Sequence, residues 1–250
     1  MHKLKKIINK LADPGALLLY LTSKEGAEEV FWRQEIQKYQ KWLQGSLPSL
    51  YNTASPAPEE IVWAQNIKDS AVLTWHKKHQ EKKYLRDLAL LPDAFSGMKV
   101  LDIGAGPIPS ATSFKNCELY CLEPLLDRYL AAGFPIHYYP STTYIHGQSE
   151  SIPITDNFFD VVISVNAIDH VNDLAKTSQE IERVLKPGGR FRMHVHYHPP
   201  TRAEPIHFTD DSFTNIFSWC KGLYKISQTQ ENFSNVLKGN ESYALWTNFE

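Results

Sequence analysis

Short apolar runs alternate with helix-like segments between residues 99 and 197, and this alternation constrains the fold more than any other feature. The run 159–165 is almost continuously apolar, as expected of a strand that is buried on both faces. Strand–helix alternation is typical of α/β proteins with a mostly parallel sheet. The expected strands are 100–103, 119–123, 144–147, 159–165 and 190–197, followed by an antiparallel hairpin of 222–228 and 242–248 at one edge.

The first 90 residues differ from the rest, because they are predicted to be helical and rich in aromatic side chains. Helices are expected at 28–43, 59–76 and 80–90. We therefore divide the chain into an N-terminal helical cap on the substrate side, residues 1–90, and a ligand-binding α/β domain, residues 91–250. The tryptophans of the first segment are interpreted as the core of a helical layer, with a substrate cleft as the alternative: Trp32, Trp42, Trp63 and Trp75.

Composition argues against several kinds of partner. The 26 basic and 28 acidic residues give a formal charge of −2, so neither nucleic acid nor an anionic membrane is expected as a partner. The basic residues within 1–10 are interpreted as a solvated helix turn. The apolar run 16–21 is too short for a membrane span, and no small-residue cleavage site follows it, so no signal peptide is expected. Three cysteines without a Cys-x-x-Cys pair predict no disulfide framework, so a cytoplasmic protein is expected.

The glycine-rich turn after the first strand of the domain indicates a nucleotide-like ligand. Gly104 and Gly106 fit the start of the Gly-x-Gly-x-x-Gly pattern, but Pro109 occupies the place of the third glycine. Asp102 at the strand end would repel a pyrophosphate and attract a cationic ligand. Glu123 ends the next strand, where a carboxylate can accept hydrogen bonds from both hydroxyls of a ribose. Two acids in these places suit S-adenosylmethionine better than NAD or ATP.

Five segments in this order resemble class I S-adenosylmethionine-dependent methyltransferases of the type that acts on small molecules. They are Val-Leu-Asp-Ile-Gly-Ala-Gly (100–106), Cys-Leu-Glu-Pro (121–124), Gly-Gln-Ser-Glu-Ser-Ile-Pro (147–153), Asn-Phe-Phe-Asp-Val-Val-Ile-Ser (157–164) and Glu-Ile-Glu-Arg-Val-Leu-Lys-Pro-Gly-Gly-Arg-Phe (180–191). The resemblance implies a Rossmann-like, mostly parallel seven-stranded sheet with helices on both faces, preceded here by the N-terminal helical segment.

The resemblance also implies which residues bind the cofactor S-adenosyl-L-methionine: Asp102, Gly104, Gly106, Glu123, Gln148, Ser149 and Asn166. Glu123 would bind the ribose, Gln148 and Ser149 would lie at the adenine edge, and Asn166 would lie beneath the methionine portion. The chain departs from the family at Ile108, where a third glycine is often found, and in the short segment 110–117 between the loop and the next strand.

The segment after the fourth strand, Asn166-Ala-Ile-Asp-His-Val171, is expected to face the transferred methyl group. An alcohol that attacks this methyl group needs a proton acceptor, and His170 is a natural one, with Asp169 as its orienting partner. The alternative is that His170 is a structural residue that caps the following helix.

A two-residue period places His194, His196 and His198 on one face of the fifth strand. One straight strand spreads three such imidazoles over about 13 Å at about 3.3 Å per residue, which is too far for one tetrahedral metal ion. We therefore predict no metal site, and we assign His196 and His198 to the substrate pocket near the carboxyl end of the strand.

Together these features predict a methyltransferase that acts on a small-molecule acceptor at oxygen, and the aromatic content is compatible with a sugar or another ring-bearing metabolite. The alternative from another class is a non-catalytic cofactor-binding or scaffolding protein with a degenerate copy of the fold. An NAD-dependent oxidoreductase is disfavoured by Asp102 and Pro109. The Asn/Asp-Pro-Pro-Tyr and Pro-Cys motifs of enzymes that methylate nucleic-acid bases do not follow the fourth strand.

Overall fold

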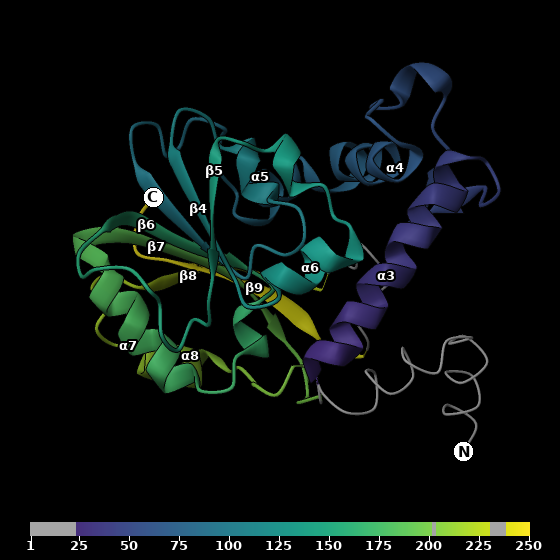
Figure 1. The fold of residues 1–250 in the computed structure, drawn as a ribbon. Coiled ribbons are helices and arrows are strands. Elements are labelled where there is room, and N and C mark those ends of the chain that lie inside the picture. Colours follow the sequence, from purple (N-terminus) through teal and green to yellow (C-terminus); the bar gives the residue numbers. More distant parts are fainter. Residues whose placement is uncertain (1–23, 202–203, 231–238) are drawn as a thin grey trace. The chain divides into compact units, whose positions relative to one another are not determined.

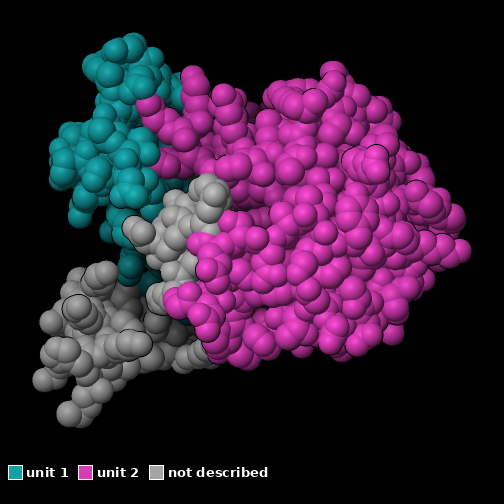
Figure 2. Space-filling view, turned by 180° about the vertical axis from the view of Figure 1, so that it is seen from behind, with its two compact units in different colours: residues 1–75, 127–135 teal, residues 76–126, 136–250 magenta. Residues whose placement is uncertain are grey.

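The structure is a computed structural model that describes residues 24–201, 204–230 and 239–250. The features predicted within residues 1–10 and 16–21 lie outside the described residues. The chain divides into two compact units, residues 1–75 with 127–135 and residues 76–126 with 136–250 (Figure 2). The assignment of residues 1–90 to a substrate-side cap stays a prediction.

The second unit contains the predicted seven-stranded sheet, in the order β5-β4-β3-β6-β7-β9-β8 (Figure 1). Strands β3 to β7 are mutually parallel where they pair, and β9 pairs antiparallel with both β7 and β8. The strand bounds are β3 Lys99–Ile103, β4 Glu118–Glu123, β5 Thr142–His146, β6 Phe159–Val165, β7 Leu185–Tyr197, β8 Tyr224–Thr229 and β9 Ser242–Thr247. The expected antiparallel hairpin therefore forms one edge, with β9 inside β8.

Apolar side chains cover both faces of this sheet. On one face, Phe191 and Val195 of β7 pack in a core with residues of α7 (Leu174–Val184) and α8 (Asp210–Ile216). On the other face, residues of β3 and β6 pack with Tyr84 of α5 (Lys83–Asp87) and with the short 3₁₀ segment η3 (Ser110–Ser113). The helices on both faces confirm the predicted fold class, although η3 replaces a full helix after the glycine turn.

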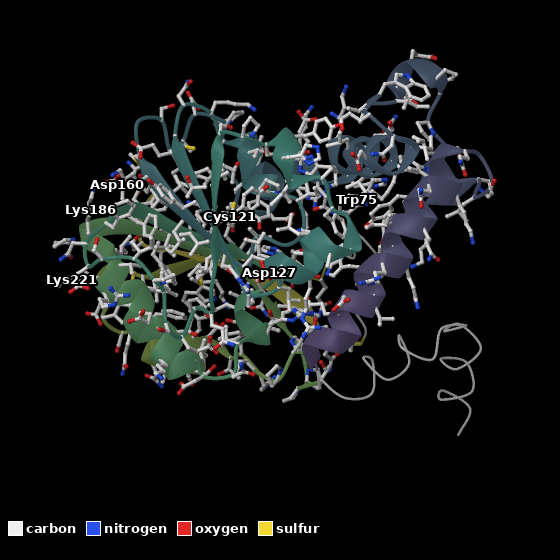
Figure 3. All side chains as sticks on the ribbon, viewed as in Figure 1. Trp75, Cys121, Asp127, Asp160, Lys186 and Lys221 are labelled. Carbon is white, nitrogen blue, oxygen red and sulfur yellow. The ribbon has the colours of Figure 1, made fainter. Side chains whose placement is uncertain are left out.

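Helix α7 shows how local sequence sets these boundaries. The Asp173 side chain accepts a hydrogen bond from the Lys176 amide and caps the helix start, as predicted. The helix ends at Val184, and β7 begins at once because Leu185 pairs with Phe159 of β6. The expected strand start at residue 190 was therefore late. Lys186, the second residue of β7, donates to Asp160 of β6 at 2.6 Å (Figure 3), which fixes this corner of the sheet.

The first unit is held together by aromatic contacts. Its helix α3 (Lys24–Leu43) contributes Tyr39, which stacks on Trp75 of α4 (Ile67–Trp75) with ring centroids 4.5 Å apart. The Trp42 Nε1–H group donates to the carbonyls of Thr53 and Ala54, which lie in the small hairpin of β1 (Ser49–Leu50) and β2 (Thr53–Ala54). Trp42 and Trp75 are buried, so these two tryptophans belong to a core.

Two predicted helices are shorter than expected. The Asn66 side chain accepts from the Asp69 amide at 2.9 Å, so α4 begins at Ile67 instead of residue 59. The helix expected at 80–90 is reduced to α5 and follows a π-helical turn, η2 (His76–Gln80). In the remaining early segment, η1 (Pro58–Glu60) is a single 3₁₀ turn. None of the helices in the described part of the chain combines the length and the apolar character needed to cross a membrane.

Candidate active site

The order in which strands are added to the sheet reverses between β3 and β6. From β3 the chain continues to β4 and β5 on one side, whereas β6 pairs with β3 on the other side. Ligands of open α/β sheets bind at the carboxyl edge beside such a switch point. The turn at 104–109 follows β3 and the segment 166–170 follows β6, so both predicted functional segments lie at this point. The Ser164 hydroxyl donates to the Ile103 carbonyl at 2.9 Å and ties the two strand ends together.

The glycine turn approaches the segment after β6 closely. Gly104 and Gly106 both have a φ of +72°, a conformation that favours glycine. A Cβ atom on Gly104 would lie 2.4 Å from the Cβ of Ala167, so no larger residue fits without movement. A Cβ on Gly106 would meet nothing within 4 Å, so its backbone faces open space. The turn thus combines a packed glycine with one that a ligand can approach.

Asp102 is fully buried at the end of β3. The Tyr84 hydroxyl donates to its Oδ1 at 3.3 Å, while Oδ2 has no hydrogen-bond partner among the described residues. Burial raises the pKa of the Asp102 carboxyl to about 8, with a further rise from the Glu123 charge, and the Tyr84 hydrogen bond opposes this shift. A cationic ligand beside Oδ2 would stabilise the carboxylate form.

Glu123 joins the end of β4 to the glycine turn. Its Oε2 accepts a hydrogen bond from the Gly106 amide at 2.9 Å, and its Oε1 accepts one from the Leu125 amide at 3.0 Å. The side chain is buried. These two backbone bonds orient the carboxylate at the carboxyl edge of the sheet, next to the turn where the predicted ribose contact requires it.

Three other predicted cofactor residues lie on neighbouring segments. Asn166 has a φ of 53°, and its amide donates to the His194 carbonyl at 2.8 Å, so the segment after β6 is tied to β7. Its side-chain Oδ1 is buried and makes no hydrogen bond to any residue that the structure describes. Ser149 is buried and its hydroxyl lies 3.1 Å from the Thr177 hydroxyl of α7, whereas Gln148 is exposed.

These groups fit the cofactor that the sequence predicts. The buried acceptors Asp102 Oδ2 and Asn166 Oδ1 match an ammonium or another donor. The exposed backbone of Gly106 permits close approach, and the Glu123 carboxylate matches a pair of hydroxyl donors.

The predicted catalytic pair is arranged differently from a simple dyad. His170 lies in the 3₁₀ turn η5 (Ile168–His170), and its Nε2 is 3.8 Å from Glu204 Oε1. The carboxylate of Asp169 is fully buried, and its Oδ2 lies 3.2 Å from Nε2 of His198. Asp169 therefore orients a histidine of β7, and Glu204 is the acid beside His170. Ligand atoms of Asp169, His170 and Glu204 all lie within 4.8 Å of one another.

The histidines of β7 share one face, as expected, and Tyr243 of β9 lies among them. The Tyr243 ring is 4.7 Å from the His194 ring and 4.9 Å from the His196 ring, while the His196 and His198 rings are 4.4 Å apart. All three histidines are buried. The column of rings ends at the carboxyl edge, where His198 meets Asp169.

The surroundings shift the pKa values of the three imidazoles in different directions. Burial lowers the pKa of His194 to about 4 and also lowers the pKa of His196. The hydrogen bond that His198 donates to Asp169 raises the pKa of His198 to about 9 against the effect of burial. At neutral pH, His194 and His196 are therefore neutral and His198 carries a proton.

Three residues of this site were missed by the sequence reasoning: Glu204, Glu241 and Tyr243. Glu204 follows an irregular segment without a hydrophobic period, so no local signal marks it. Glu241 lies just before β9, and its Oε2 is 3.4 Å from His196 Nε2. Tyr243 is directly opposite His196 in the β7–β9 register, so the predicted edge hairpin could have suggested it once its partner strand was known.

Comparisons with known proteins show similarity to methyltransferases. Residues 101–193 match the family described as methyltransferase domain. The uncharacterized methyltransferase YcgJ of Bacillus subtilis is 32% identical over 105 residues, which are 40% of this chain and 42% of that protein. A demethylmenaquinone methyltransferase of Streptomyces avermitilis is 30% identical over 121 residues, which are 48% of this chain and 52% of that protein. The crystal structure of YcgJ gives a TM-score of 0.52 with 16% identity, covering 68% of this chain and 97% of that chain.

The chain thus spans about half or less of the length of these two curated relatives in sequence. The likeness to the YcgJ structure, at 16% identity, concerns the fold alone. The matched family segment begins on β3 and ends on β7, and so contains the glycine turn, Glu123 and the segment after β6.

Proposed function

We propose that this protein transfers a methyl group from S-adenosyl-L-methionine to a small-molecule acceptor, and the match of residues 101–193 to a methyltransferase domain supports this proposal. The observation that carries the proposal is the pair of buried acids, Asp102 and Glu123, at the ends of neighbouring strands around the glycine turn. A sulfonium-bearing, ribose-bearing cofactor uses both acids, whereas Asp102 beside the turn, once ionised, would repel a pyrophosphate.

In this proposal the cofactor occupies the carboxyl edge at β3 and β4. Asp102 and Asn166 accept hydrogen bonds from the methionine portion, Glu123 accepts from the ribose, and Gly104 and Gly106 let the backbone approach. Gln148 and Ser149 lie toward the adenine. The unpartnered Asp102 Oδ2 supports a ligand donor at this position, since a buried acceptor without one costs about 1–3 kcal/mol.

We assign the acceptor side to the segment after β6 and the end of β7. The acceptor oxygen attacks the methyl carbon, the carbon–sulfur bond breaks, and the hydroxyl proton passes to a base. His170 is the proposed base, with Glu204 3.8 Å away and Asp169 next to it in sequence. His196 and His198 are proposed to line the acceptor pocket. The name of the demethylmenaquinone methyltransferase relative supports a ring-bearing acceptor in this proposal.

Calorimetry with the purified protein tests the cofactor assignment. We expect S-adenosylmethionine and its demethylated product to bind, and NAD to bind at least about tenfold more weakly, because Asp102 at the glycine turn opposes its pyrophosphate. Glu123→Ala should abolish saturable binding of S-adenosylmethionine. Asp127→Ala, which removes an exposed acid in α6 (Leu126–Ala132), should leave this binding unchanged. Binding of NAD in preference to S-adenosylmethionine would overturn the proposal.

Methyl transfer is tested with methyl-labelled cofactor and a panel of sugars, phenols and carboxylic acids. His170→Ala should lower kcat by about 10²-fold or more, without a change in cofactor affinity, if it removes the proton acceptor. The matched control is His137→Ala, an exposed histidine in η4 (Ile136–Tyr138). Equal rates for the two variants would exclude His170 as the base.

A non-catalytic cofactor-binding protein is the second candidate, and one observation favours it. The helix after the glycine turn is reduced to the four-residue 3₁₀ segment η3, so the ligand side of the turn is built differently from a full helix N-terminus. Cofactor binding together with no labelled product across the whole panel would favour this alternative. A cytoplasmic location is proposed in either case.

A further inference from the structure

Two histidines and an aspartate converge where β6 and β7 end. Asp169 comes from η5, directly after β6, and His196 and His198 come from the end of the neighbouring parallel strand β7. One ligand atom from each side chain lies within 4.8 Å of the other two. All three residues are at least 97% buried.

Polar atoms in this cluster lack the partners that burial normally demands. Asp169 Oδ1 and Nδ1 of His196 make no hydrogen bond to the residues that the structure describes, and Nε2 of His196 has only the Glu241 carboxylate nearby, at 3.4 Å. Leaving one such group unsatisfied costs about 1–3 kcal/mol. These two unsatisfied atoms match a ligand that accepts electron pairs from nitrogen and carboxylate oxygen.

A metal ion has this chemistry. Two imidazoles and one carboxylate are a common donor set for divalent first-row transition metals, with open positions left for water or substrate. Ligands at about 2.0–2.2 Å from one ion stand about 3.0–3.5 Å apart, so the observed separations require only small side-chain rotations. We propose that Asp169, His196 and His198 form a binding site for a divalent transition-metal ion.

The site differs from the one that the sequence argued against. A straight strand cannot bring His194, His196 and His198 to one ion, and His194 belongs to neither group of converging ligands. The third ligand comes instead from Asp169, which the parallel pairing of β6 and β7 places beside the last two histidines. Strand periodicity alone could not show this, because the third donor lies in another element.

The competing arrangement is an ion pair without metal. Asp169 Oδ2 and His198 Nε2 lie 3.2 Å apart, and this contact satisfies one oxygen and one nitrogen. It leaves Asp169 Oδ1 and Nδ1 of His196 without a hydrogen bond to the described residues, which a bound ion would correct. Asp169 is also shared with the group that contains His170 and Glu204, so an ion held there borders the proposed catalytic histidine.

The ion would also activate the acceptor in the proposed methyl transfer, and this part of the inference rests on the proposed function. An acceptor hydroxyl bound at an open position would lose its proton more readily, because a divalent cation stabilises the alkoxide. The acceptor class is then a molecule with two neighbouring oxygen donors, such as a diol or a hydroxy acid, which can chelate the ion.

Metal binding is measured directly, without any methyl-transfer assay. Untagged protein is stripped with a chelator and dialysed, then titrated with Zn²⁺ by calorimetry and with Co²⁺ by visible absorption, and metal content is determined by mass spectrometry. We expect one ion per chain and cobalt absorption bands characteristic of nitrogen and oxygen ligands. Asp169→Asn and His196→Gln should each weaken Zn²⁺ binding by about 100-fold or more, since loss of even an outer-sphere partner costs 10–100-fold.

The matched control is His194→Gln, which alters a buried histidine on the same face of β7 outside the cluster. It should keep the wild-type stoichiometry and affinity, and near-UV circular dichroism establishes that each variant is folded. Absence of stoichiometric metal in the wild type would overturn the proposal, as would unchanged affinity in folded Asp169→Asn. Because cofactor calorimetry is run separately, failure of methyl transfer with intact metal binding would count against the proposed function alone.

Discussion

The buried carboxyl of Asp102 should make the stability of the ligand-free protein fall between pH 6 and pH 8. Its pKa is about 8 in the folded state, against an ordinary value of 3.8. A carboxyl whose pKa is raised by folding contributes stability below its unfolded pKa, and this contribution is lost as the pH rises through the folded pKa. Asp102→Asn keeps the shape of the neutral side chain and cannot ionise.

The size of the effect follows from this shift. Well below pH 8, each rise of one pH unit lowers the free energy of unfolding by about 1.4 kcal/mol. Near pH 8 itself, the dependence of this free energy on pH is half as steep. From pH 6 to pH 8 the wild type should therefore lose about 2 kcal/mol of unfolding free energy relative to Asp102→Asn. The groups around Asp102 that set this value are Tyr84, Glu123 and Lys83.

Urea denaturation at pH 6, 7 and 8, followed by far-UV circular dichroism without cofactor, measures the difference. The matched control is Asp160→Asn, which changes an aspartate near the start of β6. Burial raises the pKa of Asp160, but hydrogen bonds from Lys186 and the Lys99 amide lower it overall, so its contribution changes only below about pH 4. A constant difference between wild type and Asp102→Asn across this pH range would refute the reasoning about Asp102.

Three further changes test the packing around the site and in the first unit. Gly104→Ala should destabilise the protein by about 1–3 kcal/mol in urea denaturation and impair cofactor binding, because its Cβ would lie 2.4 Å from that of Ala167 and its φ is +72°. Glu123→Gln should cost about 1–3 kcal/mol in the same assay, since an amide cannot accept from both backbone N–H groups that the carboxylate binds. Trp42→Phe should cost about 1–2 kcal/mol, read from thermal unfolding, because the Nε1–H group donates to two carbonyls of the β1–β2 hairpin.

The sheet could be predicted from the sequence because its signals are local. Each buried strand is a short apolar run, and Asp173 marks the start of α7 within one turn of the chain. The helices of the first unit were less well placed. Asn66 caps α4 through the amide of Asp69, yet the apolar pattern starting near residue 59 extended the expected helix through a 3₁₀ turn and an extended segment.

The site could be predicted only where its residues follow strand ends directly. Asp102 and Glu123 end β3 and β4, so their place at the carboxyl edge follows from parallel pairing. The partner of Asp169 could not be inferred in the same way. His170 is its neighbour in sequence, but the Asp169 carboxylate accepts a hydrogen bond from His198, because β6 and β7 run side by side.

Asp102 also links stability to ligand binding. The proposed cofactor is cationic at its sulfur and its amino group, so its binding should lower the pKa of the Asp102 carboxyl from about 8 and release a proton at pH 7. If the pKa in the complex falls well below 6, cofactor affinity should rise by about 50-fold between pH 6 and pH 8. Calorimetry in buffers of different ionisation enthalpy would detect the released proton. Because Asp102→Asn has no such proton, its cofactor affinity should be weak and independent of pH, and a wild-type affinity that is also flat would mean that this carboxyl does not face the cofactor's charge.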